Sequence, residues 1–146
     1  MQVPVPVPDE VTAEFWAAAR QGVLKIQRCA ECGAYQQPPG ALCQECASVE
    51  LRFERVSGRG TVHAYTETRS GARHPAFAAK TPYLVGLVEL EEQRGLLMYT
   101  NFPGATLPMM RTGAPVLVEF EPLTEEISIP QFRLVGGAGQ GEEPRG

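Results

Sequence analysis

Four cysteines are the residues of this chain whose type and spacing are suited to chemistry. They form two Cys-x-x-Cys pairs, Cys29 with Cys32 and Cys43 with Cys46, with ten residues between the pairs. A tight turn within such a pair brings two thiolates to one side of the backbone, and two facing pairs supply four sulfur ligands in a tetrahedron. The spacing therefore predicts a zinc ribbon. Its zinc ion is expected to be structural, because four thiolates leave no open position for water or substrate.

Other uses of the four cysteines fit the sequence less well. Disulfides, for which three pairings exist, form in oxidising compartments, and the sequence shows no secretory signal. A thioredoxin-like redox site has one Cys-x-x-Cys between a strand and a helix, which differs from two pairs at ribbon spacing. Iron stays open as an alternative to zinc, because an all-thiolate ligand set does not by itself exclude it.

The sequence contains no recognisable catalytic motif. It has no Gly-x-Ser-x-Gly elbow, no His-Glu-x-x-His helix and no Walker loop. Its two histidines are His63 and His74, and for His63 we expect a strand histidine that is either on the surface or satisfied by its neighbours. Nothing in the sequence therefore indicates that this chain is an enzyme by itself.

Composition limits the partners of this chain. Its 146 residues suffice for one domain or two small modules, and its net charge is −4. Residues 1–80 hold nine Lys and Arg against eight Asp and Glu, whereas residues 81–146 hold four against nine. This balance disfavours a general binder of nucleic-acid backbones. No apolar run approaches the roughly 20 residues of a membrane span, so we expect no membrane contact and a cytoplasmic location.

The segment before the cysteines predicts an arm and a short helix. Alternating Val and Pro over residues 1–8 favour an extended chain. A helix is expected from about residue 12 to 21, capped by Asp9 or Thr12. Its apolar face packs either in the protein's own core or against a partner or ligand, and this face is formed by Val11, Phe15, Trp16 and Ala19. Residues 23–28 are predicted to form a strand that leads into the first cysteine pair.

The pattern after the cysteines predicts short strands and a mainly β protein. The expected strands lie near 51–57, 60–68, 83–91, 95–102, 115–121 and 129–135. Gly58-Arg59-Gly60 suits a bend within a long first strand, and Gln93-Arg94-Gly95 suits a hairpin turn. Five strands of this kind favour a five-stranded OB-fold barrel. The expected units are residues 1–22 (arm and helix), 23–50 (zinc ribbon), 51–135 (OB-fold) and 136–146 (disordered tail).

Taken in order, these features resemble a known family of acyl-CoA-associated proteins. That family combines an N-terminal helix, a rubredoxin-like zinc ribbon and a C-terminal OB-fold, and the resemblance covers about residues 10–135. It depends on Phe15-Trp16, the two cysteine pairs, Pro38-Pro39, Gly58-x-Gly60-x-Val62, His74-Pro75-Ala76-Phe77, Pro82-Tyr83 and Gly113-x-Pro115-Val116. The sequence departs from the family at Gly40, where Arg is frequent, and at Gln44, where Pro is frequent.

The resemblance implies a function. Members are accessory subunits of thiolase-superfamily enzymes, including acyl-CoA thiolases and lipid-transfer-type aldolases, or of hotdog-fold enoyl-CoA hydratases. It implies that the OB-fold helps to hold the CoA ester while the partner subunit carries the catalytic residues. The alternative is a single-stranded nucleic-acid module, with Tyr83, Tyr99 and Phe102 as stacking residues. The acidic second half of the chain argues against that alternative.

One loop is the candidate for CoA contact. Residues 69–80 contain three fixed cations and a histidine but no acidic residue. Arginine forks and lysine charges suit phosphates, and aromatic rings suit adenine or pantetheine. With the resemblance, the expected CoA-binding residues are Arg69, Arg73, His74, Phe77, Lys80 and Tyr83. A solvated loop whose charges only aid solubility is the other interpretation.

Overall fold

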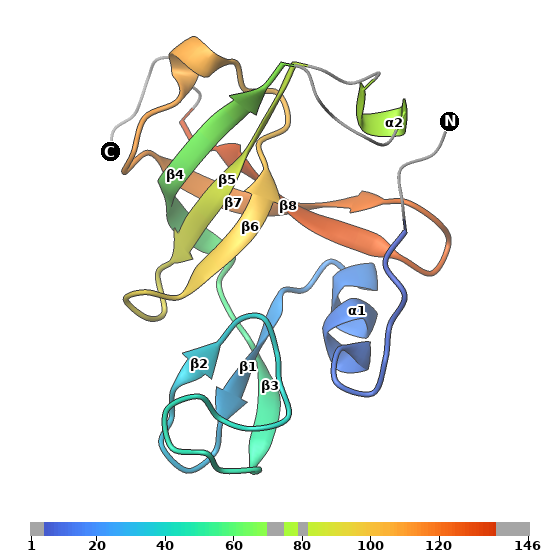
Figure 1. Ribbon diagram of the computed structural model, residues 1–146, viewed down its shortest axis with the longest axis vertical. Helices are drawn as coiled ribbons and strands as arrows, with labels where there is room; N and C mark the ends of the chain where they lie inside the picture. Colours follow the sequence, from blue (N-terminus) through green and yellow to red (C-terminus); the bar gives the residue numbers. More distant parts are fainter. Residues whose placement is uncertain (1–4, 70–74, 79–81, 137–146) are drawn as a thin grey trace.

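The computed structural model describes residues 5–69, 75–78 and 82–136, and these form a mainly β protein (Figure 1). One short helix precedes a three-stranded sheet and a five-stranded sheet, which confirms the predicted fold class. The helices are α1 (Ala13–Arg20), α2 (Pro75–Ala78) and the 3-10 turn η1 (Leu107–Met109). The small sheet has the order β2-β1-β3, with β1 (Lys25–Cys29), β2 (Tyr35–Gln36) and β3 (Leu51–Arg55). The large sheet has the order β6-β5-β4-β7-β8, with β4 (Arg59–Thr68), β5 (Tyr83–Leu90), β6 (Leu97–Asn101), β7 (Pro115–Pro122) and β8 (Ser128–Leu134).

The large sheet curls into a nearly closed barrel. All its neighbouring strands pair antiparallel, and a register shift between Val62 and Ala64 bends β4. The two edge strands, β6 and β8, lie side by side, and the Phe132 N–H donates to Thr100 Oγ1 at 3.1 Å between them. Alternate residues point inward and fill the barrel, so its most deeply buried side chains are apolar. These are Val62, Val88, Leu90, Val116 and Phe132.

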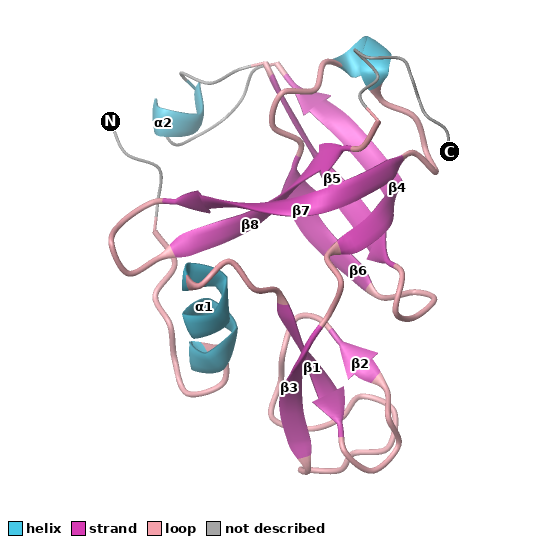
Figure 2. Cartoon of the chain, turned by 180° about the vertical axis from the view of Figure 1, so that it is seen from behind, coloured by secondary structure: helices cyan, strands magenta, loops and turns pink. Residues whose placement is uncertain are grey.

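Helix α1 packs on the protein's own core. Figure 2 shows it beneath the long β7–β8 hairpin. Phe15 is buried, and its ring packs edge to face against that of the partly buried Trp16, with the two ring centres 4.9 Å apart. Asp9 Oδ1 accepts the backbone N–H groups of Val11 and Thr12, which organises the turn before the helix. Of the two interpretations of the apolar face, the protein's own core is therefore right for Phe15. Among the helices in the described ranges, none has the length and apolar character needed to cross a membrane.

The sequence assigns the strand near 51–57 to the barrel, and this is wrong. β3 instead pairs with β1 along its whole length, from Lys25 opposite Arg55 to Cys29 opposite Leu51. The chain then turns at Gly58, which has a φ of 83° and lies so close to the barrel that a Cβ would come within 2.4 Å of Val118 Cγ1. This glycine marks the passage from the ribbon to the barrel, because other residues rarely adopt such a backbone and would clash.

The β5–β6 hairpin joins the barrel to the ribbon. The side-chain amide of Gln93 pairs with the peptide of Tyr35, accepting its N–H at 2.9 Å and donating to its carbonyl at 3.0 Å. The neighbouring Glu92 accepts the Ser57 N–H at 2.8 Å. The turn expected at Gln93-Arg94-Gly95 is confirmed, and its Gly95 has a φ of 80°. These contacts fix the orientation of the small sheet relative to the large one.

Candidate metal centre

The four cysteine sulfurs converge at the end of the ribbon. All lie within 4.8 Å of one another, with Cys29 Sγ 3.7 Å from Cys46 Sγ and Cys32 Sγ 3.6 Å from Cys43 Sγ. A tetrahedral zinc site with Zn–S bonds of roughly 2.3 Å has sulfurs roughly 3.8 Å apart. A disulfide needs roughly 2.05 Å, so these separations fit a metal and not a disulfide.

The knuckle backbone favours thiolates. The N–H groups of Glu31 and Cys32 both point at Cys29 Sγ at 3.4 Å. Several hydrogen bonds together lower the pKa of Cys29 to about 6, and the one from the Cys32 N–H has the largest effect. At Cys46 the Ser48 N–H lowers the pKa, but burial and the three neighbouring thiols outweigh it and raise the pKa to about 12. All four groups can ionise together when a cation balances their charge, and this arrangement supports a structural zinc.

Two buried glutamines position the second knuckle. Gln27 and Gln36 are 5% and 7% exposed and lie opposite each other on β1 and β2. Gln27 pairs with the peptide of Gly40 through both ends of its amide, at 2.8 and 2.9 Å, and also accepts from Gln36 at 2.7 Å. Gln36 donates to the Leu42 carbonyl at 3.0 Å and accepts the Gln44 N–H at 2.9 Å. The residues on both sides of Cys43 are therefore held by one amide network, which the sequence analysis missed.

Both departures from the family pattern, Gly40 and Gln44, lie in this network. A proline at position 44 has no N–H, whereas the N–H of Gln44 is used by Gln36. At position 40 both backbone groups are used by Gln27. Gln27 lies in the strand predicted for residues 23–28, but Gln36 lies in a strand that was not predicted, and the partners of both are peptide groups that no local pattern specifies.

Arg28 supports the first knuckle. Its Nε donates to the Gly33 carbonyl at 2.8 Å, its Nη1 contacts Glu54 on β3 at 3.1 Å, and its guanidinium lies 4.5 Å from the centre of the Tyr35 ring. The hydrogen bond from Arg28, followed by that from Arg52, lowers the pKa of Glu54. The stability contributed by this carboxylate is therefore present above the ordinary carboxyl pKa. It is lost as the pH falls through the lowered value.

Replacement of Gln36 by leucine is expected to weaken the second knuckle. The variant removes the partner of the Gln44 N–H and of the Leu42 carbonyl, and a typical hydrogen bond of this kind contributes about 0.5–1.5 kcal/mol. We expect a lower thermal midpoint and faster loss of zinc to a chelator. Gln21→Leu, at an exposed position after α1, is the matched control. Equal midpoints and equal zinc retention in both variants would show that the network does not position the metal ligands.

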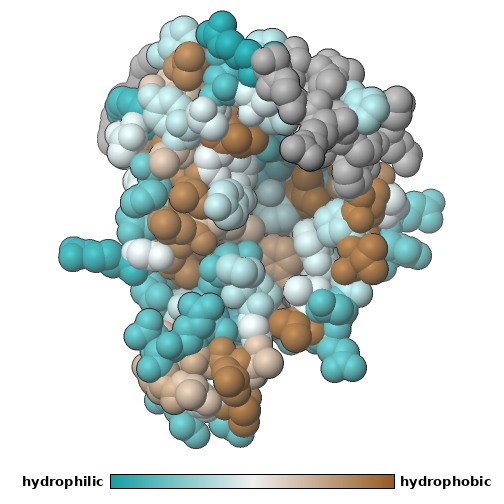
Figure 3. Space-filling model, viewed as in Figure 1, coloured by the Kyte–Doolittle hydropathy of each residue, from teal (hydrophilic) through white to brown (hydrophobic). Residues whose placement is uncertain are grey.

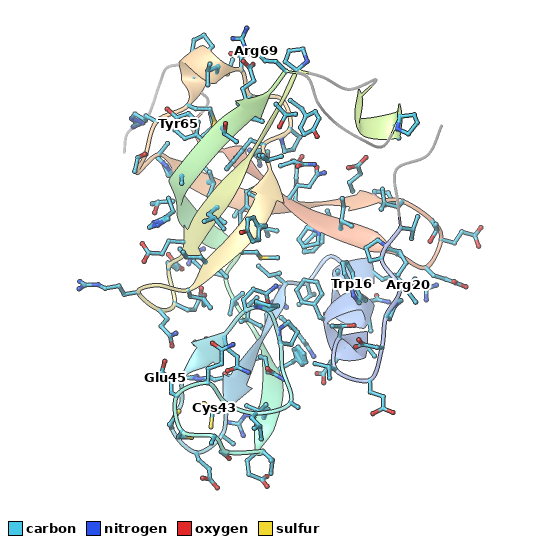
Figure 4. The ribbon with its side chains drawn as sticks, viewed as in Figure 1. Trp16, Arg20, Cys43, Glu45, Tyr65 and Arg69 are labelled. Carbon is cyan, nitrogen blue, oxygen red and sulfur yellow. The ribbon has the colours of Figure 1, made fainter. Side chains whose placement is uncertain are left out.

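The predicted CoA-binding residues are only partly within the described structure. Arg69 is exposed at the end of β4, with its Nε 2.8 Å from Glu67 Oε1, and Tyr83 begins β5. Arg73, His74 and Lys80 lie outside the described residues, as does the side chain of Phe77 in α2. Figure 4 shows Arg69 and Cys43 at opposite ends of the molecule. The structure therefore separates the metal centre from Arg69. His63 is exposed on β4, as expected.

The surface cavity beside Tyr83 is acidic on one side. Among its lining residues are Glu119, which pairs with Arg133 at 3.2 Å, and Glu121, which accepts from Gln131 at 2.8 Å. Carboxylates disfavour a phosphate in this cavity.

The fold and the cysteine cluster define a class of protein in which a four-cysteine ribbon precedes an OB-fold barrel. Residues 16–52 match the family model described as "ChsH2, rubredoxin-like zinc ribbon domain". Residues 53–121 match the one described as "ChsH2, C-terminal OB-fold domain". This chain belongs to the ChsH2 zinc-ribbon and OB-fold family, also called DUF35, which confirms the resemblance seen in the sequence.

The chain is similar to subunits of several CoA-ester enzymes. It is 35% identical over 130 residues to "Probable enoyl-CoA hydratase alpha subunit" of Thermomonospora curvata, which covers 89% of this chain and 39% of that protein. The chain thus spans about two fifths of that relative's length. It is 29% identical over 89 residues to "Benzoylsuccinyl-CoA thiolase subunit BbsA" of Thauera aromatica, covering 61% of this chain and 58% of BbsA. A chain in the solved structure "Ltp2-ChsH2(DUF35) aldolase" matches with a TM-score of 0.78 and 35% identity, over 88% of this chain and 98% of that one.

Proposed function

We propose that this chain is a non-catalytic, acyl-CoA-binding accessory subunit of a thiolase-superfamily complex, a thiolase or a lipid-transfer-type aldolase. The observation that carries the proposal is the similarity over 98% of the length of a chain in "Ltp2-ChsH2(DUF35) aldolase". The thiolase subunit among the relatives supports the same class of partner. The proposal includes a cytoplasmic location, where thiols remain reduced and available to zinc.

The division of labour in this proposal follows from the residues. The cysteines are accounted for as metal ligands, and the sequence offers no nucleophile with a base at a suitable spacing. The catalytic groups are therefore assigned to the partner. This chain contributes the OB-fold and the cationic loop 69–80, which contacts the phosphates of CoA.

A second candidate partner is a hotdog-fold enoyl-CoA hydratase. The observation that favours it is the 35% identity to a hydratase alpha subunit over 89% of this chain. A nucleic-acid module is disfavoured by the acidic residues 81–146 and by Glu119 and Glu121 beside Tyr83.

Reconstitution tests the proposal. The chain and its catalytic partner are expected to show little turnover of acyl-CoA when assayed separately and full turnover when mixed. Charge reversal of Arg69, Arg73 and Lys80 together is expected to raise the KM of the mixture for the ester and to leave the fold unchanged. Each lost charge-assisted contact is worth roughly 1.5–3 kcal/mol. Steady-state kinetics and size-exclusion chromatography of the mixtures provide the readouts.

The matched control reverses Arg20, Arg94 and Arg111, three exposed cations outside the loop. Full activity of the partner alone, or robust turnover by this chain alone, would refute the accessory role. An identical KM for the loop variant and the control variant would assign the loop to the solvated surface while leaving the accessory role in place.

A further inference from the structure

The outer edge of strand β6 carries backbone donors that are not used. In an antiparallel pair such as β5–β6, facing residues alternate between hydrogen-bonded and non-hydrogen-bonded pairs. Leu90 donates its N–H to the Leu96 carbonyl at 2.9 Å, which fixes the alternation. The backbone groups of Leu97, Tyr99 and Asn101, the β6 edge residues, therefore point away from β5. Within the described residues, none accepts a hydrogen bond from these three N–H groups.

This edge lacks the protection that the other sheet edges have. Short length, charged side chains and proline prevent a further strand from pairing with an edge. Strand β2 has only two residues, β3 carries Arg52, Glu54 and Arg55, and β8 contains Pro130. Strand β6 has five residues and contains neither a charge nor a proline, and its Tyr99 side chain is 83% exposed. The β6 edge is therefore a template for strand addition.

The surface beside the β6 edge has room for an extended segment. Cavities of about 530 and 290 Å³ border the edge, and Tyr99 lines both. Figure 3 shows the surface hollowed on this side, between the barrel and α1. Among the described residues, no charged side chain lines either cavity. A segment that pairs with β6 is therefore expected to be uncharged, because a charge placed here would lose hydration without a counter-charge.

The chain itself contains a segment with these properties. Valine and proline alternate over residues 3–8, the Val-Pro arm, which carries no charged side chain. A residue before proline is restricted to extended conformations. In an extended chain, alternate residues direct their backbone groups to opposite edges, so the valine N–H groups share one edge and the prolines, which have none, occupy the other. Among the described residues, none pairs with the N–H of Val5 or Val7, and Val7 is 86% exposed.

We propose that the Val-Pro arm of one copy of this chain adds as an antiparallel strand to the β6 edge of a second copy. The three valines of the arm and the three β6 edge residues have the same spacing of two, so each valine meets one edge residue and exchanges backbone hydrogen bonds with it. The pairing is assigned to a second copy because Val5 and Val7 do not pair with β6 of their own chain.

The prolines limit this association. They form the outer edge of the added strand, where the missing N–H groups prevent another strand from pairing. Two copies that exchange arms therefore form a closed dimer with two-fold symmetry and no growing sheet. This self-association goes beyond the proposed function and does not depend on CoA binding.

Hydrogen–deuterium exchange of the full chain reports on the arm directly. Proline has no amide hydrogen, so the valines supply the exchangeable amides of residues 3–8. Exchange is measured at low and at high protein concentration, together with the molecular mass by light scattering. We expect the valine amides and the amides of β6 to become protected as the mass rises from monomer to dimer.

Substitutions in the arm test the backbone hydrogen bonds. Val5→Pro with Val7→Pro removes two N–H groups and is expected to weaken self-association on the order of 30-fold. Val5→Thr with Val7→Thr is the matched control, because threonine keeps the N–H and a β-branched side chain. The control is expected to self-associate nearly as well as the wild type. Equal weakening in both variants would show that side chains and not backbone bonds hold the arm, and would overturn strand addition.

A mixing experiment tests whether the pairing joins two copies. Tyr99→Pro removes an outward N–H from β6 and leaves the hydrogen bonds to β5 in place, and Tyr99→Thr is its control. Circular dichroism verifies that all variants are folded. The arm variant and the edge variant are each expected to be monomeric where the wild type is dimeric. Their mixture is expected to associate, because the intact arm of one copy meets the intact edge of the other.

Three results would overturn the inference. The first is a wild type that stays monomeric with unprotected valine amides at every concentration. The second is a dimer that both proline variants leave unchanged. The third is a valine protection that appears only when another protein is added, which would assign the arm to that protein. The reconstituted acyl-CoA assay is a separate measurement, so a failure of strand exchange leaves the accessory role intact.

Discussion

Cys29→Ser is expected to release the metal and unfold the ribbon. Cys29 is 1% exposed at the end of β1, and its sulfur receives two backbone N–H groups. Structural zinc supplies on the order of 10 kcal/mol to a small site at neutral pH. Whole domains are stable by only about 5–15 kcal/mol, so the loss of one ligand leaves too little to hold the three short strands of the small sheet.

Metal analysis and thermal unfolding measure this effect. The wild type is expected to contain one equivalent of zinc, and Cys29→Ser close to none. Val49→Ser introduces a hydroxyl at an exposed position of the ribbon, just before β3, and serves as the control. Because zinc binds thiolates, the wild type is also expected to lose zinc as the pH falls. Purified wild type with intact disulfides and neither zinc nor iron would refute the metal site.

Gly86→Ala is expected to lower the free energy of unfolding by about 3 kcal/mol or more. Gly86 lies opposite Tyr65 in the centre of the β4–β5 ladder. A Cβ at position 86 would lie 2.1 Å from the Ala64 carbonyl oxygen and 2.8 Å from Tyr65 Cα. Both atoms belong to the backbone, so relief of the clash requires separating the two strands of the barrel that carry Val62 and Val88, and overpacking of this kind is strongly destabilising.

Denaturant unfolding compares this variant with Gly40→Ala. The nearest atom to a Cβ at position 40 is Gln36 Nε2 at 3.7 Å, which is ordinary contact, so the control is expected to unfold near the wild-type midpoint. If both variants unfolded at the same denaturant concentration, the close approach of β4 and β5 would not be a constraint on the fold.

The candidate site shows which functional residues could be predicted from the sequence and which could not. The metal ligands were predictable because each Cys-x-x-Cys pair sets its geometry within four residues, and the ten intervening residues bring the pairs together. The candidate CoA loop, by contrast, was proposed only from a pattern of charges, and its contact with CoA stays a prediction. Tyr83 and Arg69 are the members with described side chains, and the carboxylates of Glu119 and Glu121 reach the cavity beside Tyr83 from a strand more than 30 residues away along the sequence.

The sequence by itself determined the features that depend on neighbouring residues. These are α1 with its apolar face, the two cysteine knuckles, the hairpin turn at 93–95 and the succession of short strands that form a barrel. Each follows from backbone preferences and side-chain spacing over a few residues.

Only the tertiary structure decided which distant groups meet. An alternating strand pattern predicts a strand but not its partner, so β3 was assigned to the barrel although it pairs with β1. The amide network of Gln27 and Gln36 likewise joins groups that no local sequence pattern brings together. Polar side chains and apolar surfaces acquire their roles from groups that are far away in the sequence. Those partners are fixed only when the whole chain minimises its exposed apolar area and pairs its buried polar groups.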